Sequence, residues 1–401
     1  MSFDKAFIPY GAYWSTPFCR WQGSFAELHA IKFAGETAKE ALAARSIDPK
    51  LIEGVILGIS IPQTSVFYGG PWIAALLGAE HAPGPMTGQA CITGIQVINQ
   101  AALEIEAGQS TCRLTITADR CSNGPHLVYP SQSKPGATPV SEDWVWDNFG
   151  NDPWARNAMI QTAENVASEI GATREENDEV ALLRYNQYLD ATKDDFAFQR
   201  RYMVMPVPIK NKKGKVVKEL VGDEGITPCT AEGLAALRPA LPGGTVTYGA
   251  QTHPADGNCG LFVTTKDKAA ELSQDKGVTI QIVSFAQSRA KKGFMAAAVS
   301  PAAKLALERA NKGIKDIKTI KTHNPFAVND VGLCKEFGIP FDALNNYGSS
   351  MIYGHPQGPT AQRLVIELIE ELVLEGGGYG MFAGCAAGDS GGSLIVRVDV
   401  A

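Results

Sequence analysis

The sequence predicts an α/β fold in which helices cover the faces of a mixed or parallel sheet. Short runs rich in β-branched residues alternate with amphipathic helical stretches towards both ends of the chain. With 401 residues, the chain fits two or three domains, or one large α/β unit built from duplicated halves. The C-terminal third repeats the alternation, so we expect two α/β halves that bracket a different middle segment.

The expected elements can be placed in order along the chain. In the N-terminal half they are a helix at 24–45, a strand at 54–61, a helix at 92–107 and a strand at 113–118. In the C-terminal half they are a strand at 278–284, helices at 301–311 and 360–374, and a strand at 393–398. The middle, 121–250, contains a helix-rich segment at 162–192 and the basic loop KNKKGKVVK at 210–218. This loop is either a solvated hairpin or a contact for a phosphate-bearing cofactor or a neighbouring subunit.

Composition limits the classes of function. The formal net charge of −6 argues against extensive nucleic-acid binding. No apolar run approaches the roughly 18 residues of a membrane helix, and the N-terminus lacks the pattern of a secretory signal. We therefore expect a cytoplasmic protein with neither a nucleic acid nor a membrane as partner. The eight cysteines form no CxxC pair, which disfavours a disulfide framework and a structural zinc site, and we predict no metal.

Cys91 is a candidate nucleophile. The segment GQACITG at 88–94 leads into apolar positions with helical spacing, so Cys91 lies at the predicted start of a helix. Unpaired amide N–H groups and the positive end of the helix dipole at that place favour the thiolate form. The alternative interpretation is a small buried residue, because free cysteine packs well in a core.

Three further residues carry groups suited to proton transfer or to holding a ligand. His355 is held between Gly and Pro ahead of an amphipathic helix, and this rigidity suits a general base, although a satisfied turn histidine is the alternative. Cys385 lies in the stretch GCAAGDSGG, interpreted as a tight small-residue turn that can supply an acid/base and backbone amide donors. His323 opens the segment HNPF, where a catalytic role and a plain strand-end turn are equally compatible with the sequence.

The order and spacing of these segments resemble those of the thiolases of the thiolase superfamily over essentially the whole chain. The motifs that carry the resemblance are TPF at 16–18 with GS at 23–24, QAC at 89–91, TAENVA at 162–167 with REE at 174–176, and GHPQG at 354–358. The resemblance implies a five-layered αβαβα fold of two similar halves with an inserted loop domain. The implied domains are an N-terminal half at 1–120, completed by about 250–270, a loop domain at 121–249 that covers the CoA site, and a C-terminal half at 271–401.

The resemblance also implies catalytic roles. Cys91 would be the acylated nucleophile, His355 its activating base, and Cys385 the acid/base that exchanges a proton with the substrate α-carbon. The backbone amides of Cys91 and Ala387 would form one oxyanion hole, and His355 with a water molecule would form the other. An Asn normally fixes that water, whereas this chain has His323 at the aligned place, as some thiolase subfamilies do.

The same resemblance implies that coenzyme A is a substrate and that no cofactor is bound permanently. Thr252, His253 and Met159 are assigned to the CoA site, and Lys212 and Lys213 of the basic loop are candidates for its phosphates. Partners are acyl-CoA, CoA and further copies of the chain in a homodimer or tetramer.

The substrate is expected to be a bulky 3-ketoacyl-CoA, aromatic or carboxylated, as in the degradation of aromatic compounds. The residues that suggest it replace ones that are often smaller: His253, Tyr347, Met351 and Tyr353. Benzoylsuccinyl-CoA is one candidate, and thiolases for such substrates can work with a small zinc-binding OB-fold subunit. The alternatives are an acetyl-CoA acetyltransferase acting on acetoacetyl-CoA, a condensing synthase of the same superfamily, and a non-catalytic thiolase-like subunit.

Overall fold

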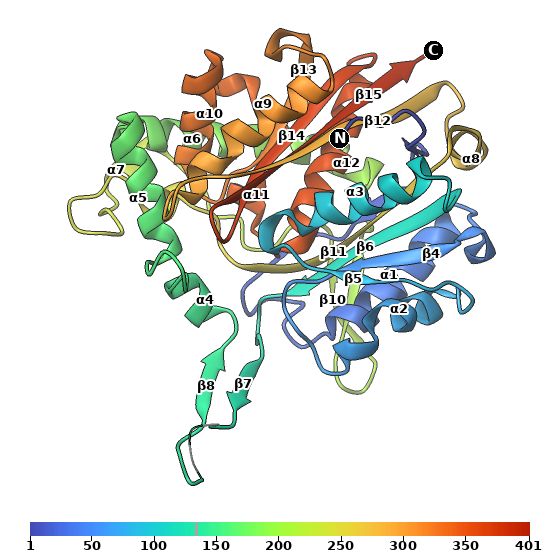
Figure 1. Cartoon of the computed structure of the whole chain (residues 1–401), viewed down its shortest axis with the longest axis horizontal. Coiled ribbons are helices and arrows are strands. Elements are labelled where there is room, and N and C mark those ends of the chain that lie inside the picture. The colour runs from blue at the N-terminus through green and yellow to red at the C-terminus, as the bar shows by residue number, and fades with distance from the viewer. Residues whose placement is uncertain (132, 134) are drawn as a thin grey trace.

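One large sheet forms the centre of the molecule (Figure 1). The computed structural model describes residues 1–131, 133 and 135–401, and eleven strands of this part form the sheet, in the order β13-β14-β15-β12-β1-β11-β6-β4-β5, with β2 and β3 also paired to β11. On the C-terminal side are β13 (Ile317–His323), β14 (Gly378–Ala386), β15 (Ser390–Val400) and β12 (Val278–Arg289). On the N-terminal side are β11 (Ala255–Thr264), β6 (Cys112–Arg120), β4 (Gly54–Gly58) and β5 (Met86–Thr87). The short strands are β1 (Phe7–Ile8), which joins the two sides by pairing with β11 and β12, β2 (Tyr13–Ser15) and β3 (Cys19–Arg20).

Helices cover both sides of the sheet and also fill the space between its two halves (Figure 1). Helices α1 (Ala30–Ala44) and α2 (Gly69–Leu77) pack on the N-terminal strands. Helices α3 (Thr93–Glu106) and α12 (Gly358–Leu374) pack against each other and against strands of both halves. Helices α9 (Val299–Arg309) and α10 (Ala327–Phe337) cover the outer face of the C-terminal strands. The five-layered αβαβα fold predicted from the sequence is therefore confirmed.

The chain between β6 and β11 carries elements that lie apart from the large sheet. Its helices are α4 (Trp146–Gly150), α5 (Met159–Ile170), α6 (Arg174–Phe196) and α7 (Ala231–Ala235). Its strands form two hairpins, β7 (His126–Tyr129) with β8 (Val140–Asp143), and β9 (Val207–Lys210) with β10 (Val216–Leu220). The β7–β8 hairpin projects from the body of the molecule (Figure 1). The remaining helices are α8 (Lys266–Leu272) and α11 (Ser350–Tyr353), and the domain limits at 121 and 249 stay a prediction.

Three predicted elements differ from the structure. The helix expected from residue 24 begins only at Ala30, because the preceding residues form turns and the Ser24 hydroxyl and N–H bind Glu224. The strand expected to reach residue 61 ends at Gly58, because the N–H groups of Ser60 and Ile61 donate to the Asp119 carboxylate and not to a neighbouring strand. The small-residue turn expected around Cys385 covers only residues 387–389, between β14 and β15, and Cys385 itself lies near the end of β14, whose buried glycines and alanines allow close packing.

Two expectations about the chain as a whole can be compared with the structure. No helix of the described residues is long and apolar enough to cross a membrane. All eight cysteines are free thiols, and Cys229 is half-buried while the others are buried.

Candidate active site

Cys91 lies in a single 3₁₀ turn, Ala90–Ile92, directly before α3, and not within the first turn of the helix itself. Ala90 has a φ of 43°, an unfavourable conformation for a residue with a Cβ. The Thr93 hydroxyl holds this turn, because it donates to Ala90 O at 2.8 Å and accepts from Gln89 N–H at 2.7 Å. The turn fixes the Cys91 side chain, which is 4% exposed.

Burial dominates the ionisation of Cys91. Desolvation raises the pKa of its thiol to about 12, and the Asp119 charge adds to this, while the backbone N–H groups of Ala387 and of Cys91 itself act to lower the pKa. The backbone N–H at the helix start therefore acts to lower the pKa of Cys91, as expected, but burial outweighs it. Cys91 is a thiol at neutral pH and needs a base to become a nucleophile.

Gly94 brings the two halves of the site together. A Cβ at this position would lie 2.4 Å from Gln362 N and 2.8 Å from Gly358 O, so only glycine allows α3 to approach the start of α12 so closely. This contact places the turn that carries Cys91 beside the segment that carries His355.

His355 lies between α11 and α12 in a tightly held stretch of backbone. Its N–H donates to His253 O at 2.9 Å, its carbonyl accepts from Ala255 N–H at 3.3 Å, and Gly354 before it has a φ of 91°. Its ring Nδ1 lies 2.6 Å from Thr360 Oγ1. Burial lowers the pKa of His355 to about 3, so the ring is neutral at pH 7 and can accept a proton.

His323 ends β13 and lies against His355. The two ring centroids are 4.1 Å apart, and the rings are tilted by 31°. His323 Nδ1 lies 2.9 Å from Ser350 Oγ, and burial lowers the pKa of His323 well below its usual value. In both histidines Nε2 is buried and has no hydrogen-bond partner within the described part of the chain.

The Cys91 sulfur and one ring nitrogen from each of the two histidines all lie within 4.8 Å of one another. Nδ1 of each ring lies beside a hydroxyl, which leaves Nε2 as the nitrogen without a partner among the described residues and free to act on the sulfur. This set of donors is also one that Zn²⁺ accepts, with bonds of about 2.0–2.3 Å, so the three atoms would have to move together to bind it.

Cys385 is the second thiol of the site. It lies in β14, fully buried, and Asn329 Nδ2 of the first turn of α10 donates to its sulfur at 3.3 Å. Burial raises the pKa of the Cys385 thiol, and a charge on Cys91 would raise it further, which places the two thiols within interaction range. A protonated thiol beside a nucleophilic one can donate a proton to a carbanion.

Gln357 and Asp119 belong to the site but were missed in the sequence. Gln357 Oε1 accepts from the Cys91 thiol at 3.4 Å, and the backbone of Gln357 has a φ of 61° and a ψ of −106°, which is rare for a residue other than glycine. Asp119 accepts the N–H groups of Ser60, Ile61 and Gly358, and so ties the start of α12 to β6. In the sequence, Gln357 could have been noticed because GHPQG has a residue with a side chain between Pro and Gly, in a segment that is otherwise typical of a turn.

The residues predicted to bind CoA fall into two groups. Thr252 and His253 lie beside the histidine pair: Thr252 Oγ1 donates to Ser350 O at 2.5 Å, and a Cβ on Gly354 would lie 2.6 Å from the His253 ring. Lys212 and Lys213 lie in the exposed turn of the β9–β10 hairpin, and Met159 begins α5. Their contact with CoA stays a prediction.

Two of the four residues that suggested a bulky substrate have other roles in the structure. Tyr353 is fully buried: its hydroxyl donates to Glu367 at 3.1 Å and its ring lies 3.7 Å from the Arg363 guanidinium carbon, so core packing accounts for it. The Tyr347 ring stacks on Phe198 at a centroid distance of 3.8 Å. These two tyrosines therefore give no support for an aromatic substrate.

Comparison with known proteins assigns the family. Residues 12–267 match the thiolase N-terminal domain and residues 277–398 match the thiolase C-terminal domain. The chain is 28% identical over 401 aligned positions to the 3-oxoadipyl-CoA/3-oxo-5,6-dehydrosuberyl-CoA thiolase of Escherichia coli K12, covering 95% of this chain and 97% of that one. It is 27% identical over 398 positions to a probable acetyl-CoA acetyltransferase of Mycobacterium leprae, with the same coverage. The crystal structure of human mitochondrial 3-ketoacyl-CoA thiolase in complex with CoA superimposes with a TM-score of 0.88 at 25% identity over 99% of both chains. The chain therefore belongs to the thiolase family and is an acyltransferase.

Proposed function

We propose that this thiolase cleaves a 3-ketoacyl-CoA with CoA, or runs the reverse Claisen condensation, through an acyl group carried on Cys91. The observation that carries the proposal is the convergence of the Cys91 sulfur and the two imidazoles within 4.8 Å, in a place where the Ala387 N–H meets the sulfur. A thiol, a neutral imidazole and aimed amide donors are the groups that acyl transfer to sulfur needs.

The cleavage proceeds in two halves. His355 Nε2 takes the Cys91 proton as the sulfur attacks the 3-keto carbon, and the negative charge passes to the keto oxygen. The bond between the α- and β-carbons breaks, and Cys385 donates its proton to the departing acyl-CoA carbanion. The thiol of a second CoA then gives its proton to the Cys385 thiolate and attacks the Cys91 thioester. The bond between the acyl carbon and the Cys91 sulfur breaks, His355 returns its proton to Cys91, and the new acyl-CoA leaves.

The two developing charges require separate donors. The amides of Cys91 and Ala387 are proposed for the tetrahedral intermediate at the acyl-enzyme, since both act on the sulfur in this structure. Protonated His355 and a water held by His323 are proposed for the other oxyanion. Loss of one such donor typically costs about 100- to 1000-fold in rate.

The acyl-enzyme can be tested by mass spectrometry. Cys91→Ser should abolish both turnover and the covalent adduct that forms on exposure to an acyl-CoA, while the protein stays folded, because a hydroxyl is a far weaker nucleophile at neutral pH. Cys112→Ser, at a buried cysteine in β6, is the matched control and should keep the adduct. An adduct on a residue other than Cys91, or turnover retained in Cys91→Ser, would refute the proposal.

The finer proposal is a bulky, aromatic or carboxylated acyl group. Its remaining support is His253 beside the catalytic histidines, with a buried Nε2 that has no partner among the described residues and can meet a substrate carboxylate. A thiolase named for a dicarboxylic 3-oxoadipyl-CoA is among the relatives. The test is the ratio of kcat/KM for a bulky aromatic 3-ketoacyl-CoA and for acetoacetyl-CoA, with and without a co-encoded zinc-binding OB-fold subunit. A ratio well below one in both conditions would favour the acetoacetyl-CoA alternative.

A further inference from the structure

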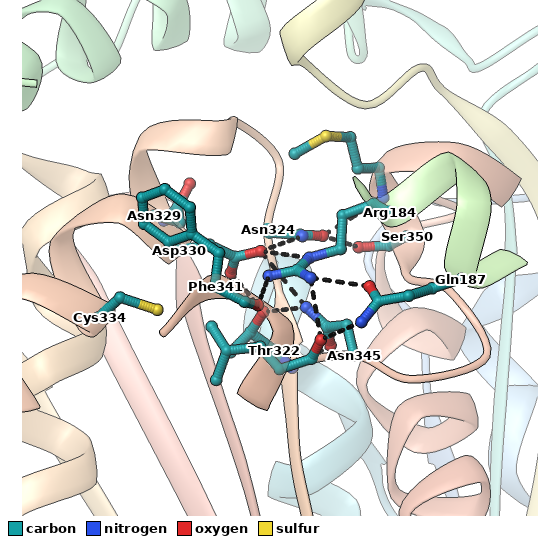
Figure 2. Close-up of polar contacts among 12 residues, drawn as sticks. Arg184, Gln187, Thr322, Asn324, Asn329, Asp330, Cys334, Phe341, Asn345 and Ser350 are labelled. Atoms are coloured by element: carbon teal, nitrogen blue, oxygen red, sulfur yellow. Dashed lines mark hydrogen bonds and ion pairs between the residues drawn. The ribbon is translucent and has the colours of Figure 1, made fainter. Parts of the chain in front are cut away.

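A chain of buried polar side chains leads from an ion pair to His323, and Figure 2 shows this chain as far as Ser350. Arg184 of α6 and Asp330 of α10 are fully buried, and Arg184 Nε donates to Asp330 Oδ2 at 2.9 Å. Asn324 Nδ2 donates to the same carboxylate oxygen at 2.7 Å. On its other side Asn324 meets Ser350, and the Ser350 hydroxyl meets His323 Nδ1.

The orientation of the Asn324 amide is decided by its neighbours at both ends. An ionised carboxylate only accepts hydrogen bonds, so the Asn324 NH₂ group must face Asp330. The backbone N–H of Met351 only donates, and it lies 3.3 Å from the opposite end of the amide, which must be the carbonyl Oδ1. Figure 2 shows this arrangement, with Asn324 between Asp330 and Ser350.

The carbonyl of Asn324 in turn orients the Ser350 hydroxyl. Ser350 Oγ lies 3.4 Å from Asn324 Oδ1, a long contact, and 2.9 Å from His323 Nδ1. A hydroxyl has one proton. If Ser350 gave that proton to His323, its oxygen would face the Asn324 oxygen lone pair to lone pair inside a buried site, where such a pair is costly. If Ser350 donates to Asn324, its free lone pairs can accept a proton from His323 Nδ1–H.

We propose that Asn324 and Ser350 are positioning residues that hold His323 in the Nδ1–H tautomer, so that Nε2 is a bare acceptor facing Cys91 and His355. In the reaction proposed above, on which the catalytic part of this inference rests, His323 then binds a water molecule by accepting one of its protons. The second proton of that water points to the substrate oxyanion. His323 thus acts on the oxyanion through the water and does not donate to it directly.

Burial is consistent with a ring held neutral for this purpose. His323 is fully buried, and the titratable groups beside it are the neutral His355 ring and the Cys91 thiol. The charged groups Arg184 and Asp330 neutralise each other, and Ser350 and Asn324 separate them from His323. The hydrogen bond to Ser350 is therefore what selects which nitrogen of the neutral ring carries the proton.

Nitrogen NMR of the free enzyme with ¹⁵N-labelled histidine tests the tautomer without any need for activity. The signals of His323 can be assigned by their loss in His323→Asn. We expect a pyrrole-type signal for Nδ1 and a pyridine-type signal for Nε2. A protonated Nε2 in the wild-type protein would overturn the proposal, even if Ser350→Ala does not fold.

The second arm compares two neighbouring buried serines. Ser350→Ala should mix or invert the His323 tautomers and lower kcat by about 10- to 100-fold, by analogy with the loss of hydrogen bonds that orient metal-binding histidines, with little change in KM. Ser349→Ala is the matched control, because the Ser349 hydroxyl is buried without a partner among the described residues, and it should leave both tautomer and kcat unchanged. An unaltered His323 signal in Ser350→Ala, or equal losses in the two variants, would overturn the assignment. If the wild-type protein shows the predicted tautomer but transfers no acyl group, the proposed function fails while the tautomer assignment stands.

Discussion

Asp330→Asn should destabilise the protein by about 3–5 kcal/mol, the usual cost of removing one partner of a buried ion pair. Asp330 and Arg184 are both fully buried. The new amide can keep its oxygen towards Arg184 Nε and Asn324 Nδ2, while its NH₂ group meets the Thr322 hydroxyl that now donates to the carboxylate at 2.5 Å. The hydrogen-bond geometry is kept in this variant, so the loss of stability measures the cost of burying the Arg184 guanidinium without its counter-ion.

The assay is chemical denaturation followed by tryptophan fluorescence at one fixed protein concentration, because self-association would otherwise change the apparent stability. Lys291→Gln is the control: Lys291 pairs with Glu169, and the two side chains are 59% and 47% exposed, so its loss should cost at most about 1 kcal/mol. If Asp330→Asn lost no more stability than Lys291→Gln, the charge of Arg184 would be balanced by the carbonyls of Leu344 and Phe341 alone, and the reasoning would fail.

Three other predictions concern proton transfer, CoA and pH. Cys385→Ala should slow carbon–carbon cleavage and α-proton exchange more than acylation of Cys91. Asn329→Ala should have the same effect more weakly, because the Asn329 amide donates to the Cys385 sulfur. Single-turnover acylation and solvent deuterium exchange measure the two steps, and equal losses in both would contradict separate roles for the two cysteines. Replacing Lys212 and Lys213 by Gln should raise KM for CoA and flatten its salt dependence, and an unchanged KM would place the phosphate contact elsewhere. Burial lowers the pKa of His355 to about 3, so its contribution to stability is fully present above the pKa of 6.5 in the unfolded chain and is lost as pH falls towards 3. His355→Asn should therefore make the free energy of unfolding depend less on pH below 6.5. An equally steep dependence in this variant would refute the argument.

Much of the site could be predicted because its motifs specify backbone geometry. Gly94 is needed where α3 meets α12, and Gly354 takes a φ of 91° directly before His355. Glycine permits the close approach and the positive φ at low cost, so both features can be predicted from glycines in the sequence. The order of the motifs then places Cys91 and His355 in facing halves.

Other features depend on tertiary contacts and left no such trace. The local sequence does not mark any of the hydrogen-bonding residues Asn324, Asp330 and Ser350 as unusual. Only the folded chain joins them in one hydrogen-bond path. Residues 384–386 were interpreted as part of a turn, although they end strand β14, because glycine and alanine have low strand propensity while burial between layers favours small residues there. The net pKa shift of Cys91 could not be predicted for a related reason, since the sequence indicates a helix start but does not show how completely the thiol is removed from water.

The directions of the two pKa shifts predict how Cys91 reacts before substrate binds. Burial raises the pKa of the Cys91 thiol to about 12 and lowers that of His355 to about 3, so both shifts oppose a standing thiolate–imidazolium pair. The proton should therefore move only as the sulfur attacks, when the charge passes to an oxygen that faces the Ala387 N–H and the histidines. Alkylation of Cys91 by iodoacetamide, located by mass spectrometry, should then be slow at neutral pH and should rise steadily with pH, with half-buried Cys229 as the internal reference. A fast, pH-independent alkylation of Cys91 below neutral pH would show that the ion pair is already formed, because only a thiolate held by a charged partner reacts in that way.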